Sequence, residues 1–527
     1  MLTLSQKFKA GILVFLGSLT WSLTMVKSGL VYSYGMGFWG PNGHDGVWHV
    51  SLINSLSHGS LDMPIFSGYL IQNYHVGFDL ILALVHKLTS IPASTLYFQI
   101  LPPLLAIGIG WSVFSFVYAW RKNFTAAWIS TFFVYFGGSL GWMFNGGESA
   151  FWSQQSISTL VNPPFALSLI IIFIAMKLMI SSPQKIIVIS LLFASLSLIK
   201  VYASILVLAG LLLISIVDRR NFKLFLITLF ISLALFIPLN YKSSSLIVFK
   251  PGWFLQTLVS LSDRFYLPRL YQALISPNPI KKIMGYSITL FIFIVGNFGT
   301  RLFIIGRQKL DKIYIFILTI IFSGLVVPML FVQTGTPWNT IQFFYYSVML
   351  LGVLTGLSLS KLRWYLVIPI LLLTLPTTYV TLGQYLPSRP PAKISLEELE
   401  ALKFLSTQPT GITLTYPAMP DAYAPPPRPL YLYESTAYVS AYSGHLVFME
   451  DEVNLNITNY PWPARKQQIK DFYNYTSLSQ ARQFISDNHI RYIYLPQVAS
   501  IRPKFSATEL GGKVLFENPR VAIWMVQ

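Results

Sequence analysis

The chain has 527 residues, of which 54% are hydrophobic and only 11% are charged. Soluble globular proteins carry about 25% charged residues, so this composition excludes an ordinary soluble protein and indicates that lipid surrounds most of the chain. The net charge is +18 and cysteine is absent, which excludes disulfides and thiolate metal sites. Because the basic residues cluster between apolar runs, we attribute the charge to the positive-inside rule and expect no nucleic-acid partner.

Apolar runs long enough to cross a membrane recur along the chain, and they predict a polytopic α-helical protein with about 11–13 transmembrane helices. The candidate spans lie near 10–26, 74–91, 95–119, 124–144, 164–180, 186–199, 201–217, 222–239, 284–306, 313–333, 340–360 and 364–382. An even number of crossings would return the chain to its starting side. One apolar segment within 74–119 is therefore expected to be re-entrant or split.

The charges between the spans predict the orientation. Basic clusters such as Arg121/Lys122 and Lys361/Arg363 are typical of cytoplasmic connections, whereas residues 28–86 contain no Lys or Arg. We therefore expect a multi-pass protein of the cytoplasmic (plasma) membrane, surrounded by membrane lipids. Its N-terminus is predicted to be cytoplasmic, and the residues after 383 are predicted to be extracytoplasmic.

Composition changes after the last apolar run, which predicts two domains. Residues 1–382 are expected to form a transmembrane domain with a first outer loop over 27–73, and residues 383–527 a small extracytoplasmic α/β domain. Within the second domain, the capping box that starts at Ser395 predicts a helix to about Leu405. Hydrophobic alternation predicts a further helix over 478–487 and strands over 411–416, 491–495 and 521–526.

The first outer loop concentrates ionisable side chains in a chain that has few of them. They are His44, Asp45, His49, His58, Asp62 and His75. Three interpretations stay open from the residues alone. The loop is an ordinary polar surface, or His44, Asp45 and His49 hold a divalent metal ion, since 45 and 49 are one helical turn apart. In the third, Asp45 is a catalytic carboxylate that accepts a proton from a hydroxyl.

The order of motifs in this region resembles the GT-C superfamily of membrane glycosyltransferases. Gly43-His44-Asp45-Gly46-Val47-Trp48-His49 follows the first helix, and Gly59-Ser-Leu-Asp-Met-Pro64 and Tyr74-His75-Val76 precede the next apolar run. Protein O-mannosyltransferases, aminoarabinose transferases and oligosaccharyltransferases of this superfamily carry an essential acid in the first outer loop. Here Gly46 stands where many members have a second acid, and Tyr74-His75-Val76 replaces a proline-containing motif.

The resemblance implies transfer of a hexosyl or pentosyl unit from a polyprenyl-phosphate-linked donor to an extracytoplasmic protein, lipid or glycan acceptor. It implies that Asp45 is the base and that the sugar carbon is inverted. A divalent metal ion is the cofactor that stays open. A role in building the cell envelope follows from such an activity.

Further candidates for binding the donor lie at other predicted outer positions. Lys200 separates two apolar runs, and Lys250, Arg264 and Arg269 break the positive-inside rule. Trp338, Asn339 and Gln342 are suited to stacking on a sugar and bonding its hydroxyls, although snorkelling lysines and an aromatic belt explain such residues equally well. The predicted substrate-binding residues are His44, His49, His75, Lys200, Lys250, Arg264, Arg269, Trp338, Asn339 and Gln342.

Two other functions remain as alternatives, namely a transporter or flippase of lipid-linked glycans and a non-catalytic envelope assembly protein. Transporters usually place ionisable groups at mid-membrane. Asp79 is the acidic residue within a predicted span, and it lies near that span's outer end. This placement favours an enzyme over a transporter. An assembly protein would differ in not depending on Asp45.

Overall fold

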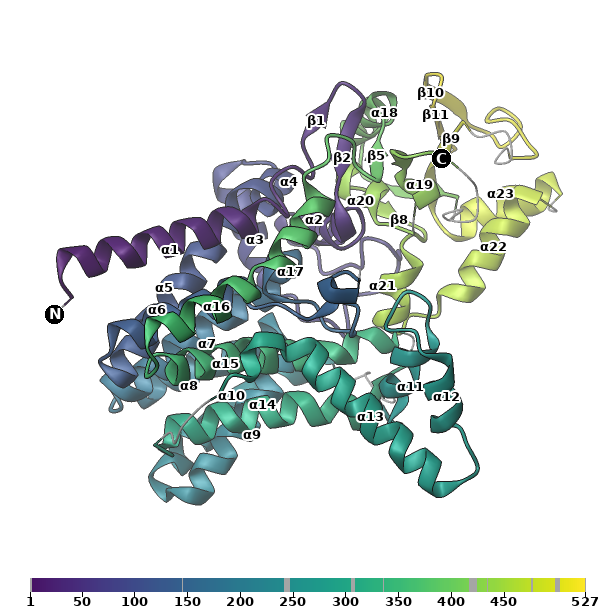
Figure 1. Cartoon of the computed structure of the whole chain (residues 1–527). Coiled ribbons are helices and arrows are strands. Elements are labelled where there is room, and N and C mark those ends of the chain that lie inside the picture. Colours follow the sequence, from purple (N-terminus) through teal and green to yellow (C-terminus); the bar gives the residue numbers. More distant parts are fainter. Residues whose placement is uncertain are drawn as a thin grey trace. The chain divides into compact units, whose positions relative to one another are not determined.

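The computed structural model describes residues 2–144, 146–240, 247–304, 309–334, 336–416, 424–433, 435–474, 477–497 and 503–526 (Figure 1). The chain divides into two compact units. Unit 1 consists of Met1–Thr24 and Pro102–Leu386, and unit 2 of Met25–Leu101 and Pro387–Gln527. The boundary at Leu386 lies close to the predicted one at 382. The predicted transmembrane domain over 1–382 is nevertheless divided, because the first loop packs with the C-terminal segment.

Unit 1 is mainly helical. Its helices are α1 (Leu4–Ser22), α5 (Leu101–Arg121), α6 (Phe124–Phe136), α7 (Pro163–Ser181), α8 (Ile186–Ile199), α9 (Val201–Val217), α10 (Phe222–Asn240), α11 (Trp253–Ser260), α12 (Pro268–Leu274), α13 (Pro279–Phe298), α14 (Lys312–Leu330), α15 (Gln342–Leu359), α16 (Trp364–Thr374) and α17 (Pro376–Tyr385). Strands β3 (Ile247–Phe249) and β4 (Phe331–Gln333) form an antiparallel pair.

Seven helices in the described ranges are long and apolar enough to cross a membrane. They are Ala93–Arg121, Pro163–Ser181, Arg219–Asn240, Pro279–Leu302, Lys312–Leu330, Pro337–Leu359 and Trp364–Tyr385, and α8 and α9 are shorter apolar helices. The predicted span over 74–91 is a helix of only 13 residues, α3 (Gly77–Thr89). At 1.5 Å per residue it is about 20 Å long, too short for a hydrocarbon core of about 30 Å. Helix α3 is thus too short for a full crossing, which agrees with the expectation that one apolar segment within 74–119 is not a complete span.

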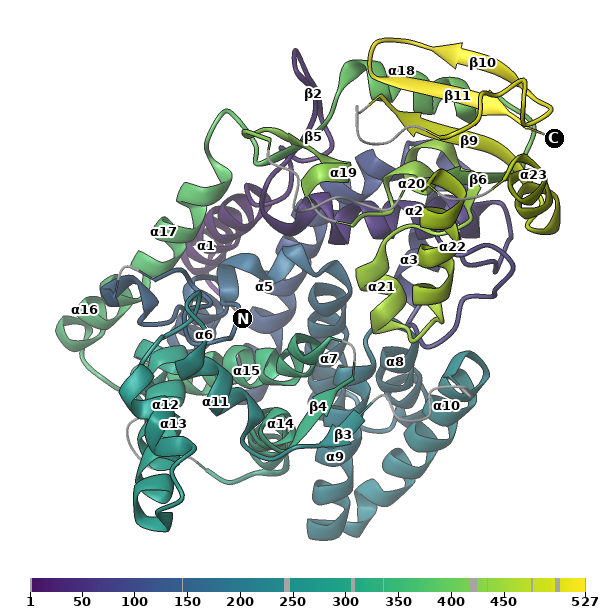
Figure 2. The ribbon, with the colours of Figure 1, turned by 90° about the vertical axis from the view of Figure 1, so that its right-hand side faces the viewer.

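Helix α15 lies at the centre of unit 1, because 89% of the residues in the apolar stretch of the helical segment Pro337–Leu359 are buried. It packs against α6, α9 and α14, and Figure 2 shows α15 next to α6 and α14. Glycines allow the closest approach, because a Cβ atom on Gly356 would lie 2.3 Å from the backbone nitrogen of Ser130. Small residues at such positions bring helix backbones together and gain van der Waals contact without a hydrophobic driving force from water.

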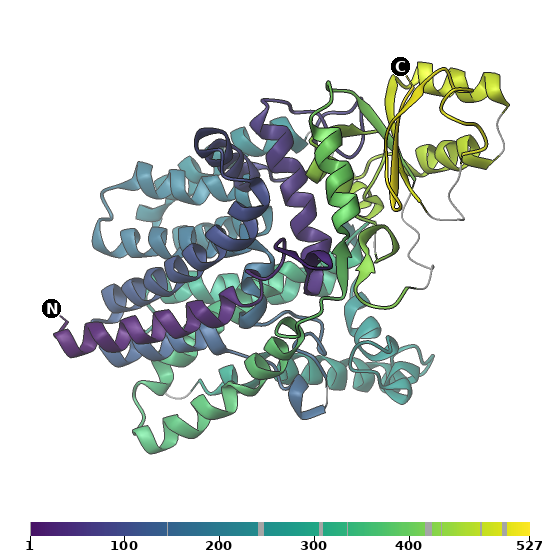
Figure 3. The same cartoon turned by 90° about the horizontal axis from the view of Figure 1, so that it is seen from above.

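Unit 2 combines a five-stranded sheet with helices. The sheet has the order β10-β11-β9-β6-β8 and consists of β6 (Ile412–Thr415), β8 (Leu446–Val447), β9 (Ile490–Pro496), β10 (Lys513–Glu517) and β11 (Val521–Met525). Strand β6 is parallel to β8 and β9, whereas β11 is antiparallel to β9 and β10. Figure 3 shows helices on both sides of the yellow strands. The central strand β9 is accordingly buried along nearly all of its length.

The helices of unit 2 come from both of its chain segments. They are α2 (Asp45–Ser57), α3, α4 (Ala93–Thr95), α18 (Leu396–Ser406), α19 (Leu430–Tyr433), α20 (Tyr438–Ser443), α21 (Glu452–Ile457), α22 (Trp462–Asn474) and α23 (Leu478–Asp487). The predicted capping box is present, because Ser395 Oγ accepts from the Glu398 amide at 3.2 Å and Glu398 accepts from the Ser395 amide at 3.0 Å. The predicted helix over 478–487 and the strands over 411–416, 491–495 and 521–526 are confirmed as α23, β6, β9 and β11.

A second sheet joins the first loop to the C-terminal segment. It has the order β1 (Val31–Tyr32), β2 (Gly35–Phe38), β5 (Ala392–Ile394) and β7 (Arg428–Pro429). Strand β2 pairs with β5 in antiparallel register, so that Met36 faces Ile394. Gly35 has φ +114°, and a Cβ atom there would lie 2.1 Å from the Ile394 carbonyl oxygen, so this pairing requires glycine. The sheet therefore fixes the start of the first loop against residues that follow the last apolar helix.

Candidate active site

Asp45 is an accessible carboxylate that its neighbour holds in place. It is the first residue of α2, where a negative charge is favoured by the helix dipole. Its side chain is 51% exposed, whereas the side chain of His44 is only 7% exposed. The His44 Nδ1 atom lies 2.8 Å from Asp45 Oδ1. A buried ring thus orients an exposed acid, which is the arrangement expected of a general base.

The other ring nitrogen of His44 faces Asp451 from the C-terminal segment, with 3.2 Å between Nε2 and Oδ1. Burial of the ring opposes its charging, but the charges and hydrogen bonds of Asp451 and Asp45 prevail and raise the pKa of His44 well above its ordinary value. The imidazolium form donates from both nitrogens, one to each carboxylate. His44 therefore lies between two acids, an arrangement that favours the charged form of its ring.

Asp451 lies in a tightly organised segment. Its side chain is fully buried, and it accepts from the Asn454 backbone amide at 3.1 Å and from Asn454 Nδ2 at 2.8 Å, thereby capping α21. Its φ of +53° is left-handed. The preceding carboxylate, Glu450, accepts from the amides of Val439 and Ser440 at 3.2 and 2.9 Å. Burial, with a smaller contribution from the charge of Asp451, raises the pKa of Glu450 to about 8.

A second histidine–carboxylate pair lies in the same unit. His49 Nδ1 is 2.6 Å from Asp79 Oδ1, and the Asp79 side chain is completely buried. The ring of Tyr97 stacks on His49 with 5.2 Å between centroids and 22° between planes. His75, another predicted binding residue, is half-buried and stacks on Tyr74 at 4.7 Å. Of the predicted loop residues, His49 therefore belongs to a pair that is separate from His44 and Asp45.

The metal interpretation requires His44, Asp45 and His49 to converge on one ion. Instead, His44 faces Asp45 and Asp451, and His49 faces Asp79. Within the described ranges, no group of three His, Asp or Glu side chains is arranged to hold a metal ion. Both nitrogens of His44 are engaged by carboxylates, so the ring offers no lone pair for coordination in this arrangement.

The structure gives a steric reason for Gly46, which stands beside Asp45 in place of a second acid. A Cβ atom on Gly46 would lie 2.4 Å from Phe98 Cζ and 3.2 Å from Tyr97 Cε1. The Phe98 ring is fully buried. An acidic side chain at position 46 would therefore overlap with this ring, and α2 carries a single acid at its start.

Unit 1 brings together several of the predicted donor-binding residues. Lys200 is 4% exposed, and its Nζ atom donates to Asn162 Oδ1 at 3.3 Å. Asn162 Nδ2 donates to Gln342 Oε1 at 3.3 Å, and Gln342 Nε2 donates to Asn339 Oδ1 at 3.1 Å. We call these four residues the Lys200 cluster. Asn162 was not among the predicted binding residues, and it joins Lys200 to Gln342.

Three helices of unit 1 begin at the Lys200 cluster. Lys200 is the N-cap of α9, Asn162 is the N-cap of α7, and Gln342 is the first residue of α15. The Asn162 side chain also accepts from the Phe165 amide at 3.2 Å, as an N-cap does. The N-termini of α7 and α9 carry partial positive charge, whereas α8 ends at Lys200 and contributes partial negative charge, so the lysine itself is the main source of positive charge. The cluster is therefore electropositive and suited to an anion such as phosphate.

Trp338 and Arg264 lie in a separate aromatic cluster of unit 1. Trp338 stacks on Trp152 with 4.5 Å between ring centroids, and the Arg264 guanidinium carbon lies 4.6 Å from the centroid of Trp152. One face of Trp338 is therefore already covered by protein, although the residue is 44% exposed. Lys250 and Arg269 are exposed and join neither cluster within the described part of the chain.

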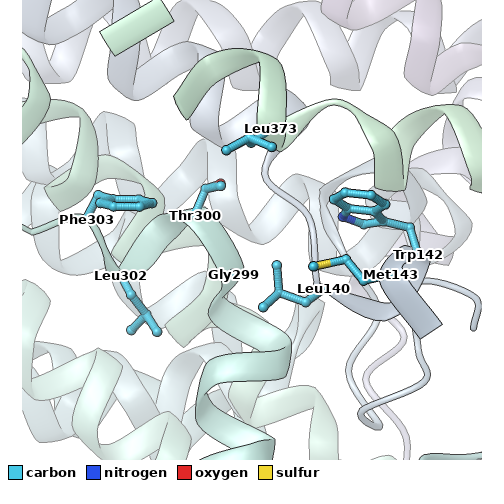
Figure 4. A pocket seen from close by; sticks show the side chains of 8 residues that line it. All are labelled: Leu140, Trp142, Met143, Gly299, Thr300, Leu302, Phe303 and Leu373. Carbon is cyan, nitrogen blue, oxygen red and sulfur yellow. The ribbon is translucent and has the colours of Figure 1, made fainter. Parts of the chain in front are cut away.

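Unit 1 also contains an apolar pocket of about 400 Å³ (Figure 4). It is lined by Leu140, Trp142, Met143, Gly299, Thr300, Leu302, Phe303 and Leu373. No lining side chain carries a charge, so the pocket suits a hydrocarbon chain and not a phosphate or a sugar. Its walls share no residue with the Lys200 cluster.

Sequence reasoning gave no role to Asp451 or Tyr97. Asp451 lies within an acidic run, Glu450-Asp451-Glu452, which is the one local signal that it offers. Its contact with His44 joins residues 407 positions apart and has no counterpart in local spacing. Tyr97 lies within a predicted membrane span, where a tyrosine normally indicates the membrane interface.

No protein-family model matches the sequence, and no curated protein matches it. Solved structures do match. Arabinofuranosyltransferase AftD from Mycobacteria matches with a TM-score of 0.53 at 11% identity, over 100% of this chain and 40% of its own. The fold is GT-C-like. This chain thus spans well under half the length of AftD, and the likeness concerns the fold alone.

Two further GT-C glycosyltransferases match with lower scores. The Archaeoglobus fulgidus oligosaccharyltransferase matches with a TM-score of 0.48 at 12% identity, over 93% of this chain and 69% of its own. ArnT from Cupriavidus metallidurans, solved with undecaprenyl phosphate, matches with 0.40 at 12% identity, over 98% and 97%. The GT-C-like fold agrees with the resemblance expected from the order of motifs in the first loop.

Proposed function

We propose that this chain is a membrane glycosyltransferase that moves a sugar from a polyprenyl-phosphate-linked donor to an extracytoplasmic acceptor. One observation carries the proposal. In a GT-C-like fold, Asp45 presents a half-exposed carboxylate at the start of α2, held by a buried histidine. An acid that is exposed yet oriented by a second group is more typical of catalysis than of a solvated surface loop.

The proposed reaction is a single displacement at the sugar carbon. The acceptor oxygen bonds to the anomeric carbon while the bond from that carbon to the phosphate oxygen breaks, so the configuration inverts. Asp45 takes the acceptor's hydroxyl proton, and the polyprenyl phosphate leaves with the bonding electrons. The leaving group gains negative charge, which requires nearby cations or oriented donors.

The Lys200 cluster of unit 1 is the proposed site for the donor's phosphate. A buried lysine is expensive in a membrane protein unless it faces water or an anion. Here it lies between the end of α8 and the start of α9, beside the side-chain amide of Asn162. The hydrogen bond to Asn162 holds the ammonium group in place, so that it is suited to binding an anion within unit 1.

The test is release of polyprenyl phosphate in proteoliposomes. Undecaprenyl-phosphate-linked mannose, glucose and arabinose are offered with a membrane extract as acceptor, with and without EDTA. We expect release by the wild type and near-complete loss in Asp45→Asn. Asp62→Asn is the matched control, because this loop carboxylate contacts Ser60 and lies outside the His44 pair. Wild-type turnover by Asp45→Asn would refute the base, and the EDTA arm reports any metal requirement.

Lys200→Met tests the phosphate site separately. We expect the KM for the donor to rise at least about tenfold, because one charge-assisted interaction with the phosphate is lost. Lys177→Met in α7 is the control for removing a lysine from an apolar helix. An unchanged donor KM in Lys200→Met would refute the site. Movement of a lipid-linked glycan across the bilayer without any release would favour the transporter alternative instead.

A further inference from the structure

We propose that Asp451 is a positioning residue for the transfer reaction, acting through His44 to fix the Asp45 carboxylate. The inference rests on the proposed function of Asp45. It makes the C-terminal segment a part of the catalytic machinery and not only a domain attached to it.

The geometry forms a rigid chain of three side chains. Asp45 Oδ1 lies 2.8 Å from His44 Nδ1, and His44 Nε2 lies 3.2 Å from Asp451 Oδ1. Side-chain exposure falls from 51% at Asp45 through 7% at His44 to 0% at Asp451. Hydrogen bonds at both nitrogens restrict the rotation of the imidazole ring. The buried end of the chain therefore determines where its exposed end points.

Asp451 is itself anchored to the first loop. The segment before it forms backbone hydrogen bonds with the turn that follows α2. The Val447 amide donates to the Pro64 carbonyl at 2.8 Å, and the Glu450 amide donates to the Ile65 carbonyl at 3.0 Å. The Ser67 amide donates to the Val447 carbonyl at 3.0 Å. These bonds fix the distance between Asp451 and the loop that carries His44.

Capping of the α21 amide does not by itself require the charge of Asp451. Asparagine is as good as aspartate at a helix N-cap and tolerates left-handed φ equally well. The neutral residue would therefore suffice to cap α21 at φ +53°. The carboxylate's charge is used at His44. Asp45 and Asp451 are the charged side chains within ion-pair distance of that ring in the described part of the chain, and Glu450 instead accepts from the amides of α20.

Asp451→Asn is consequently the informative variant, because it keeps one oxygen for the Asn454 backbone amide and suits the backbone conformation. It removes the charge together with the second acceptor, which bonds Asn454 Nδ2 at 2.8 Å. We expect the full-length variant to fold and to bind the donor with unchanged KM. We expect kcat to fall about 10²-fold, the effect of misplacing a reacting group by about an ångström. Glu452→Gln is the matched control, because Glu452 is the next residue after Asp451. Its carboxylate pairs with Lys466 at 2.7 Å and forms no ion pair with His44.

A double-variant cycle separates positioning from a purely structural role. The single variants are His44→Gln and Asp451→Asn. If Asp451 acts through His44, the double variant should lose no more activity than the more impaired of the two single variants. A structural role predicts losses that multiply, and that result would overturn the inference. Wild-type kcat in Asp451→Asn would overturn it as well.

Titration of the His44 ring by nitrogen NMR tests the pairing of His44 with Asp451 without relying on sugar transfer. In the detergent-solubilised full chain, with His44→Gln used for assignment, Asp451→Asn should lower the His44 midpoint by about one pH unit or more. An unchanged midpoint would refute the pairing. If the wild type transfers no sugar while the midpoint falls, the pairing stands and the catalytic roles of Asp45 and Asp451 are both refuted.

Discussion

Replacing Gly46 by alanine tests how closely α2 is packed where it presents Asp45. The new methyl carbon would lie 2.4 Å from Phe98 Cζ and 2.5 Å from Cε1, about 1 Å inside ordinary contact. Overpacking of this kind costs about 1–3 kcal/mol, whereas alanine gains about 0.5–1 kcal/mol over glycine in a helix. The middle values of these two ranges leave a net destabilisation of about 1 kcal/mol. Asp45 is the preceding residue, so kcat should also fall.

The assay compares thermal unfolding of the detergent-solubilised chain with sugar release in proteoliposomes. Phe98→Leu removes the ring atoms that the methyl group would meet. The double variant should therefore be more stable than the sum of the two single changes, which is the signature of direct contact. A Gly46→Ala protein that is as stable and as active as the wild type would refute the packing described for α2.

Three further predictions concern stability. Between pH 4.5 and about 8 the folded chain retains a proton on Glu450 that the unfolded chain has released. Wild-type stability should therefore fall with rising pH by up to about 1.4 kcal/mol per unit, and denaturation of Glu450→Gln at pH 5, 6.5 and 8 should lack this contribution. Ser395→Ala should lower the unfolding free energy by about 1 kcal/mol, whereas Ser395→Thr retains the cap; equal denaturation curves would refute this. Gly356→Ala should lower the midpoint of thermal unfolding more than Gly46→Ala, because the new Cβ atom would lie 2.3 Å from a backbone atom. Gly11→Ala is the control and should not lower the midpoint, because no atom lies within 4 Å of its Cβ position.

Sequence reasoning succeeded where the determinants are local. The capping box at Ser395 and the helix over 478–487 depend on residues within one or two helical turns, and both are present. The candidate acid and its histidine are adjacent in sequence, and the structure joins them. The alternation of the strands was sufficient to locate β6, β9 and β11.

The remaining features depend on distant parts of the chain. Hydropathy gives a span over 74–91 because Leu80–Val85 is apolar, but it does not show that the helix ends at Thr89 after 13 residues. Similarly, His49 does not join His44, because its ring is hydrogen-bonded to Asp79 of α3. Helical spacing placed positions 45 and 49 on one face but carries no information about the partner that each side chain meets.

The domain boundaries show the same limit. A change in composition near 383 marks where the apolar helices end, and one of the divisions between the two compact units lies at Leu386. Composition does not reveal that strand β2 pairs with β5, which brings residues 25–101 into the unit of the C-terminal segment. Of the predicted binding residues, Lys200, Asn339 and Gln342 meet in one cluster, because three helices happen to begin together in unit 1.

The wide separation of His44 and Asp451 has a consequence during biosynthesis. The two residues are 407 positions apart, which at about 5–20 residues per second corresponds to about 20–80 s of translation. On the predicted topology, the first loop is exported early and the segment that contains Asp451 follows much later. A nascent chain that has not yet reached position 451 therefore carries Asp45 and His44 without Asp451. On the proposed function, synthesis of this segment, rather than insertion of the first helix, completes the positioning of Asp45.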